Sequence, residues 1–105
     1  MLKIRKRSGE EVLFDRSKIE RAIEKANASV SIPERLDRDI IAGIALSIEN
    51  ACSNMKTIPT VESVQDMVEY ANAKAGAYRL AKNYAVYRYQ HELMRKANTT
   101  DDKIL

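Results

Sequence analysis

Apolar and polar residues alternate at the start of the chain with the two-residue period of a β-strand. The alternation runs through residues 2–7 and 11–14, and Gly9 between them supplies the backbone freedom that a tight turn needs. This pattern predicts an N-terminal β-hairpin. Leu2, Ile4 and Lys6 would share one face of the first strand, which places Lys6 at the end of a face that packs on a core.

Lys6 belongs to a cluster of four cations: Lys3, Arg5, Lys6 and Arg7. A lysine at the end of a buried face is costly unless it is paired, so a carboxylate or a ligand phosphate is expected beside it. Alternatively, the strand ends at Ile4 and the cations form a solvated edge that discourages aggregation. The pattern leaves both interpretations open.

Apolar residues then recur at three- and four-residue steps, which is the spacing of amphipathic helices. Asp15 is a suitable N-cap for a first helix that runs to about Ser29. Pro33 precedes a second helix, which ends near Asn54, because proline is tolerated only at or before the first turn. The positions expected to face the core on these helices are Ile19, Ala22, Ile23, Ala26, Val30, Leu36, Ile40, Ile41, Ile44, Ile48 and Ala51.

Two further helices follow in the same spacing. Thr60 caps the third helix, and Gly76 interrupts the pattern. The fourth helix runs from about Ala77 to Ala97, where the polar residues 98–102 would break it. The inward positions expected on these two helices are Val61, Val64, Met67 or Val68, Ala71, Leu80, Ala81, Tyr84, Tyr87 and Leu93.

Thr57 and Ile58 could add a short strand to the hairpin. The predicted fold is therefore α+β, with a small three-stranded antiparallel sheet capping a four-helix cluster. Residues 1–97 would form one domain, and residues 98–105 would begin a linker to a downstream region. A frayed natural terminus is the alternative for those last residues.

Length and composition fit one soluble domain with a single core. The chain has 105 residues, no apolar run long enough to span a bilayer and no signal-peptide pattern. Its one cysteine, Cys52, cannot form an internal disulfide and is expected as a small buried helix residue. These features predict a cytoplasmic protein with no membrane partner. The net charge of +3 suits anionic small molecules and argues against nucleic acid as a partner.

The residues form no catalytic constellation. His91 has no cysteine or serine partner at a motif spacing, and one cysteine with one histidine is not a zinc-ligand set. We therefore do not expect the chain to be an enzyme by itself.

Binding of a polyanion is better supported by the pattern. Lys18 lies on the first turn of the helix after the hairpin and would point back toward the helix N-terminus. With Lys6 or Arg7 and the free N–H groups of that turn, it could clamp a triphosphate. A lysine that is simply exposed on the helix surface is the alternative for Lys18.

Three segments together resemble the ATP-cone, a small nucleotide-sensing domain. Residues 4–19, I-R-K-R-S-G-E-E-V-L-F-D-R-S-K-I, are similar to its opening, with a basic pair, a turn glycine, a hydrophobic-Phe-Asp step and Lys-Ile. Residues 64–69 resemble its Ile-Gln-x-x-Val-Glu helix, and residues 81–88 its Ala-x-x-Tyr-x-x-Tyr-Arg helix. The chain departs from the family at Ser8, where aspartate is usual, and in residues 70–74, which lack the usual leucine.

The resemblance implies a three-stranded sheet on four helices, with ATP or dATP and magnesium bound between hairpin and helices. By position, three cations would contact the phosphates: Lys6, Arg7 and Lys18. Arg88 and His91 on the fourth helix would be further phosphate contacts. The positions implied for base and sugar are Val12, Asp15, Ile19 as an apolar wall, and Thr60, Val61 and Gln65 near the adenine.

Such domains resemble the N-terminal allosteric domain of the large, catalytic subunit of ribonucleotide reductase, an oxidoreductase that makes deoxyribonucleotides for DNA replication. The resemblance implies that ATP activates and dATP inhibits through a change of oligomeric state. The implied partners are the rest of the large subunit, the small subunit and further copies of the chain. The aerobic or anaerobic class, and one or two nucleotides per cone, stay open.

Two alternatives differ from this hypothesis. The cone could belong to a nucleotide-sensing transcriptional repressor, whose zinc-ribbon cysteines would precede it. The chain could also be a free-standing helical interaction module whose basic edge binds nucleic acid or an acidic protein.

Overall fold

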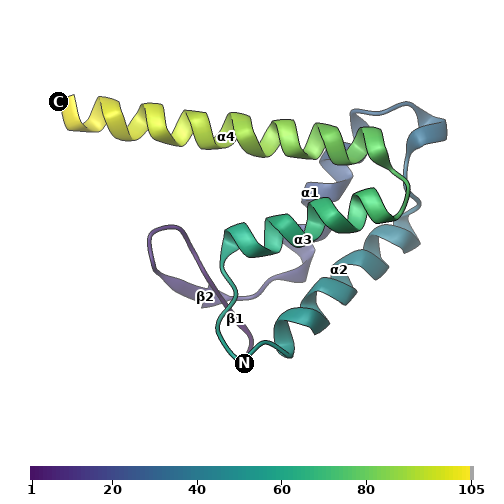
Figure 1. The fold of residues 1–105 in the computed structure, drawn as a ribbon, viewed down its shortest axis with the longest axis horizontal. Coiled ribbons are helices and arrows are strands. Elements are labelled where there is room, and N and C mark those ends of the chain that lie inside the picture. Colours follow the sequence, from purple (N-terminus) through teal and green to yellow (C-terminus); the bar gives the residue numbers. More distant parts are fainter. Residues whose placement is uncertain (105) are drawn as a thin grey trace.

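The computed structural model describes residues 1–104, with side chains as far as residue 97. A hairpin of β1 (Lys3–Arg5) and β2 (Glu11–Leu13) precedes α1 (Arg16–Ala28). The short 3-10 helix η1 (Ile32–Glu34) leads into α2 (Arg38–Ser53), and α3 (Val61–Lys74) and α4 (Tyr78–Ile104) complete the chain (Figure 1). The predicted α+β architecture with four helices is confirmed.

The hairpin forms where alternation predicted it. β1 and β2 pair antiparallel, with Ile4 opposite Val12, and Gly9 adopts a φ of 92° in the turn. The first strand ends at Arg5, so Lys6 belongs to the turn and its side chain is exposed. Of the two interpretations left open for Lys6, the one that extends a buried strand face to it is wrong, because the strand ends at Arg5.

A third strand does not form in the described residues. The connector before α3 meets β1 only once, through a parallel bridge between Arg5 and Thr60 and a hydrogen bond from the Arg5 N–H to the Pro59 carbonyl (2.9 Å). The predicted strand at Thr57 and Ile58 is wrong for a physical reason. Pro59 has no N–H to donate to a ladder, and Thr60 already caps α3.

The helix caps follow the predicted residues. Asp15 Oδ1 accepts a hydrogen bond from the Ser17 N–H at 3.0 Å and caps α1. Thr60 and Ser63 form a reciprocal capping box at the start of α3, with hydrogen bonds of 3.1 and 3.0 Å. Gly76 has a φ of 84° between α3 and α4, a conformation that favours glycine.

The core lies between the four helices. Helix α1 packs against α2 and α4, and α3 packs against α2 and α4. Cys52 is only 1% exposed, as predicted for a small core residue. The buried apolar residues are Ile19, Ile23, Ala26, Val30, Ile41, Ala45, Ile48, Cys52, Val64, Val68, Ala77, Leu80 and Tyr84.

Helix α4 departs from the prediction in its second half. Tyr87 and Leu93 were expected to face inward, but they are 42% and 48% exposed. Figure 1 shows that the C-terminal part of α4 projects beyond α1 and α3, which leaves that part without a facing helix, whereas Tyr87 lines a cavity between α1 and α4. The predicted break at residues 98–102 is also wrong, because α4 continues to Ile104. Threonine and aspartate cost only tenths of a kcal/mol each in a helix (up to about 0.7), which does not stop one already formed.

Helix α3 buries a polar side chain. Asn72 is 0% exposed, and among the described residues neither its Nδ2 nor its Oδ1 has a hydrogen-bond partner. Asn72 lies within residues 70–74, where the family's usual leucine is missing.

In the part of the chain that the structure describes, no helix combines the length and the hydropathy needed to cross a bilayer.

Candidate functional site

A cavity of about 620 Å³ opens between the hairpin, the first two turns of α1 and α3, and the second turn of α4. Its walls are mostly apolar and come from all four of these elements. They include Ile4, Val12, Phe14, Ile19, Val64 and Val68. Its polar lining residues are Lys6, Asp15, Lys18, Gln65 and Tyr84. An apolar pocket with a few converging polar groups is the usual form of a small-molecule site.

Two lysines supply the positive charge of this cavity. Lys6 comes from the hairpin turn and Lys18 from the first turn of α1, and both are exposed. Among the residues described, no carboxylate lies within ion-pair distance of either ammonium group. The hairpin and α1 therefore bring together two cations that are available to an anionic ligand.

The backbone N–H groups in the first turn of α1 are less available to a ligand phosphate than the sequence suggested. The Ser17 N–H donates to the Asp15 carboxylate, and the Lys18 N–H donates to the Asp15 carbonyl at 3.1 Å. The hydroxyl of Ser17 also donates to Asp15 Oδ1, at 2.6 Å. The cap thus occupies two amides that had been expected to meet phosphate, and the lysines are left as the main anion-binding groups.

Asp15 remains ionised beside the two lysines. The hydrogen bond from the Ser17 hydroxyl is the main cause that lowers the pKa of Asp15. Desolvation opposes it, whereas the Ser17 N–H and the charges of Arg21 and Lys18 also lower the pKa. Because Oδ1 is committed to the cap, Asp15 fixes the start of α1 at the edge of the cavity.

Tyr84 forms part of the cavity wall and was not predicted as a site residue. It comes from α4 and is 5% exposed. Burial raises the pKa of its hydroxyl to about 12. The spacing of apolar residues assigned Tyr84 to the core. Its place in the Ala-x-x-Tyr motif was the signal that could have identified it as a site residue.

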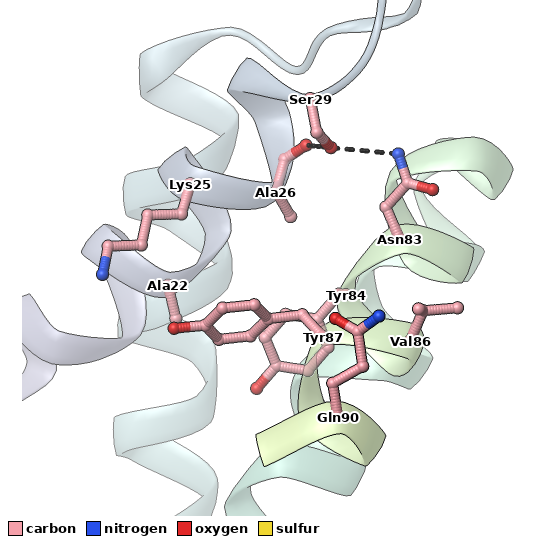
Figure 2. Close-up of a pocket in the computed structure, with 9 residues that line it drawn as sticks. All are labelled: Ala22, Lys25, Ala26, Ser29, Asn83, Tyr84, Val86, Tyr87 and Gln90. Atoms are coloured by element: carbon pink, nitrogen blue, oxygen red, sulfur yellow. Dashed lines mark hydrogen bonds between the residues drawn. The ribbon is translucent and has the colours of Figure 1, made fainter. Parts of the chain in front are cut away.

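A second cavity, of about 410 Å³, lies between α1 and α4 (Figure 2). Tyr84 and Ala22 line both cavities, so they form a shared wall. Asn83 donates to the Ser29 hydroxyl at 2.9 Å on one side, and Lys25 extends away from the side chains of α4 (Figure 2). None of the predicted site residues lines this second cavity.

Arg7 and Thr60 lie at the edge of the first cavity and not on its wall. The guanidinium of Arg7 forms an ion pair with Glu62 (Nε to Oε1, 2.8 Å) and donates to the Gln65 side-chain oxygen at 3.0 Å. The Thr60 hydroxyl accepts the capping hydrogen bond of α3. Both predicted residues therefore have structural partners in this conformation.

Arg88 and His91 are not brought to the cavity wall. Nη1 of Arg88 lies 2.8 Å from oxygens of both Asp66 and Glu69. Burial alone would lower the pKa of Arg88, but the hydrogen bonds to these carboxylates raise it. His91 is exposed, and its ring centroid lies 4.2 Å from that of Tyr87.

The cavity thus collects seven of the eleven residues predicted for a nucleotide site: Lys6, Val12, Asp15, Lys18, Ile19, Val61 and Gln65. These residues lie on β2, on α1, on α3 and in the hairpin turn, which are distant in sequence. The lining residues that sequence reasoning missed are Ile4, Leu13, Phe14, Ala22, Val64, Val68 and Tyr84.

Comparison with known proteins shows the family to which the chain belongs. The family model of the ATP cone domain matches residues 2–93, and the chain belongs to this family. The chain is 31% identical to the ribonucleoside-diphosphate reductase subunit alpha of Chlamydia muridarum, over 99% of this chain and 11% of that protein. It is 33% identical to a vitamin B12-dependent ribonucleoside-diphosphate reductase of Mycobacterium tuberculosis, over 90% of this chain and 13% of that protein. The chain therefore spans only about a tenth of the length of these relatives.

Proposed function

We propose that this chain is an allosteric regulatory domain of a ribonucleotide reductase, which binds ATP or dATP in the cavity between hairpin, α1 and α3. The observation that carries the proposal is that Lys6 and Lys18 both line the same apolar cavity. Among the described residues, neither lysine forms an ion pair with a carboxylate. The membership of the ATP cone family and the reductase relatives support it.

The cavity suits the two ends of an adenine nucleotide. Lys6 and Lys18 would neutralise the phosphates as point charges. Val12, Ile19 and Val61 would enclose the base, and the amide of Gln65 could hydrogen-bond to it. The volume of about 620 Å³ lies within the usual range for such sites, roughly 300–1,000 Å³.

A magnesium ion would enter with the phosphates. Among the described residues, no group of three or more histidine, cysteine, aspartate or glutamate side chains is placed to hold a metal ion. Mg²⁺ usually keeps several waters and binds through substrate phosphates, so the nucleotide itself would provide the ligands.

The bound nucleotide would act by changing how the domain associates. ATP would permit reductase activity and dATP would inhibit it through oligomeric state, which requires that the two ligands favour different arrangements of hairpin and helices. The hairpin is the element best suited to move, because its strands have three residues each and few apolar contacts. The partners would be the rest of the large subunit, the small subunit and further copies.

A thermal-shift comparison with ATP, dATP, GTP and duplex DNA tests the binding part. We expect dATP and ATP to raise the melting temperature more than GTP does, because the family resemblance implies that Val61 and Gln65 of the cavity lie near the adenine. An interaction module with a basic edge would instead bind DNA with a steep salt dependence and ignore dATP. In the structure Arg5 and Arg7 of that edge are already paired with Glu11 and Glu62, which weakens this alternative.

Light scattering of the intact parent protein tests the regulatory part. We expect the mass with dATP to differ from the mass with ATP at equal magnesium concentration. The same mass with both nucleotides, together with confirmed binding, would leave a nucleotide-binding domain that does not control assembly.

A further inference from the structure

Arg7 joins the tip of the hairpin to the first turn of α3. Its Nε lies 2.8 Å from Glu62 Oε1, and its Nη2 donates to Gln65 Oε1 at 3.0 Å. The side chains of Arg7 and Glu62 are 34% and 48% exposed. Arg7 therefore already has a carboxylate partner, although its neighbour Lys6, one residue earlier, has none among the residues described.

The Arg7–Glu62 ion pair stands beside the cavity. Gln65, which accepts the second hydrogen bond of Arg7, lines the cavity, as does Lys6. A phosphate that reaches Lys6 would therefore come close to the guanidinium. Phosphate offers arginine a bidentate partner with more charge than a carboxylate. A half-exposed ion pair is weak, so an incoming phosphate group can replace Glu62.

We propose that Glu62 competes with the nucleotide phosphates for Arg7, so that binding exchanges one partner of Arg7 for the other. This inference rests on the proposed function. In the free domain, the ion pair holds the hairpin turn against α3. In the bound domain, Arg7 turns to the phosphates and the hairpin turn is released from Glu62.

The exchange would couple occupancy of the cavity to the position of the hairpin. The other link between β1 and the start of α3 is the backbone hydrogen bond from Arg5 to the Pro59 carbonyl, which needs no side chain and can persist. The hairpin could then pivot at Arg5 while its tip leaves α3. Such a movement gives the ligand two arrangements with different affinities, which is what an allosteric effect requires.

Calorimetric titration of four variants with magnesium-dATP and with inorganic tripolyphosphate tests the proposal. Glu62→Gln removes the competing charge and keeps the shape of the side chain. Glu34→Gln is the matched control, because Glu34 also forms an ion pair, with Arg79 Nε at 3.0 Å. Glu34 belongs to η1, which lies at the end of the domain away from the hairpin (Figure 1). The third variant is Arg7→Ala alone, and the fourth combines Arg7→Ala with Glu62→Gln.

We expect Glu62→Gln to bind both ligands about two- to fivefold more tightly than Glu34→Gln does, the range that corresponds to a half-exposed ion pair. In the Arg7→Ala background the same change should give no gain. The melting temperature of the free Glu62→Gln domain should stay equal or fall, so affinity and stability move in opposite directions. A purely structural role of Glu62 would lower both.

Three results would overturn the exchange. They are a gain no larger than that of Glu34→Gln, a loss of affinity, or a gain that persists without Arg7. If the unaltered domain binds neither dATP nor tripolyphosphate, the proposed function itself fails. Binding by the unaltered domain without a gain in Glu62→Gln overturns only the exchange.

Discussion

Arg88 on α4 forms an ion pair with Glu69 on α3, in which Nη1 lies 2.8 Å from Oε1. The same nitrogen lies 2.8 Å from Asp66 Oδ1, and Nη2 donates to the Glu62 carbonyl at 3.3 Å. The Arg88 side chain is 20% exposed. This arginine therefore fixes α4 on α3, one turn beyond the cavity residue Tyr84.

We expect Arg88→Ala to lower the free energy of unfolding by about 1.5–3 kcal/mol, because it removes hydrogen bonds between charged groups. The affinity for dATP should change by less than about threefold, well below the loss of a direct phosphate contact. Urea denaturation and calorimetry give the two values. A large loss of affinity with unchanged stability would instead make Arg88 a phosphate ligand, as the family resemblance implied.

Asn72 offers a second test of what holds the helices together. Replacing it with leucine keeps the number of side-chain heavy atoms and removes two buried polar atoms that lack partners among the described residues. We expect Asn72→Leu to raise the free energy of unfolding by about 1–3 kcal/mol. Asn27→Leu is the matched control and should destabilise, because Asn27 bonds to the Leu36 N–H and carbonyl at 2.8 and 3.0 Å. Destabilisation by Asn72→Leu would show that the amide has a partner such as buried water.

The raised pKa of Tyr84 predicts that the domain loses stability at alkaline pH. Its pKa is raised from 10.0 to about 12 in the folded state, so the unfolded chain loses this proton first. Its contribution to stability is fully present below about pH 10 and is lost as the pH rises toward 12. We expect Tyr84→Phe to lose less stability than the unaltered domain between pH 8 and about pH 11 in urea titrations. Tyr89→Phe, at a position that is 61% exposed, should behave like the unaltered domain.

The two lysines of the cavity should matter for binding and not for folding. We expect Lys6→Ala and Lys18→Ala each to weaken dATP binding by about 1.5–3 kcal/mol, as for a charged hydrogen bond. Stability should stay equal or rise, since each change removes a cation without a carboxylate partner in the described structure. Lys3→Ala is the control, because Lys3 lies on β1 and does not line the cavity. Equal affinities for all three variants would contradict the assignment.

Turn glycines, helix-capping residues and the spacing of apolar residues were enough to predict the hairpin turn and the starts of two helices. Gly9 has the positive φ angle that its turn needs, Gly76 separates α3 from α4 as expected, and Asp15 and Thr60 cap the helices they were expected to cap. The spacing of apolar residues also placed Leu80 in the core. Each of these outcomes depends on one residue and its near neighbours in sequence.

Features that depend on distant parts of the chain were not predictable in this way. The exposure of Leu93 follows from the length of α4 relative to its neighbours, and that of Tyr87 from the cavity between α1 and α4; no local pattern contains either. The ion pairs of Arg7 and Arg88 with α3 required knowledge of which helix lies opposite. The lining of the cavity by Tyr84 has the same origin, because α4 meets the hairpin side of the domain only in the folded chain.

The central claim is that an adenine nucleotide binds between the hairpin, α1 and α3. Titration of dATP into the ¹⁵N-labelled domain, followed by amide chemical shifts, tests it most directly. We predict that the largest saturable shifts fall at Lys6, Val12, Lys18, Val61 and Gln65. A separate groove between α2 and α3, lined by Ser47 and Lys74 among others, should show no shifts. Shifts centred on that groove, or no saturable shift at millimolar dATP, would contradict the account.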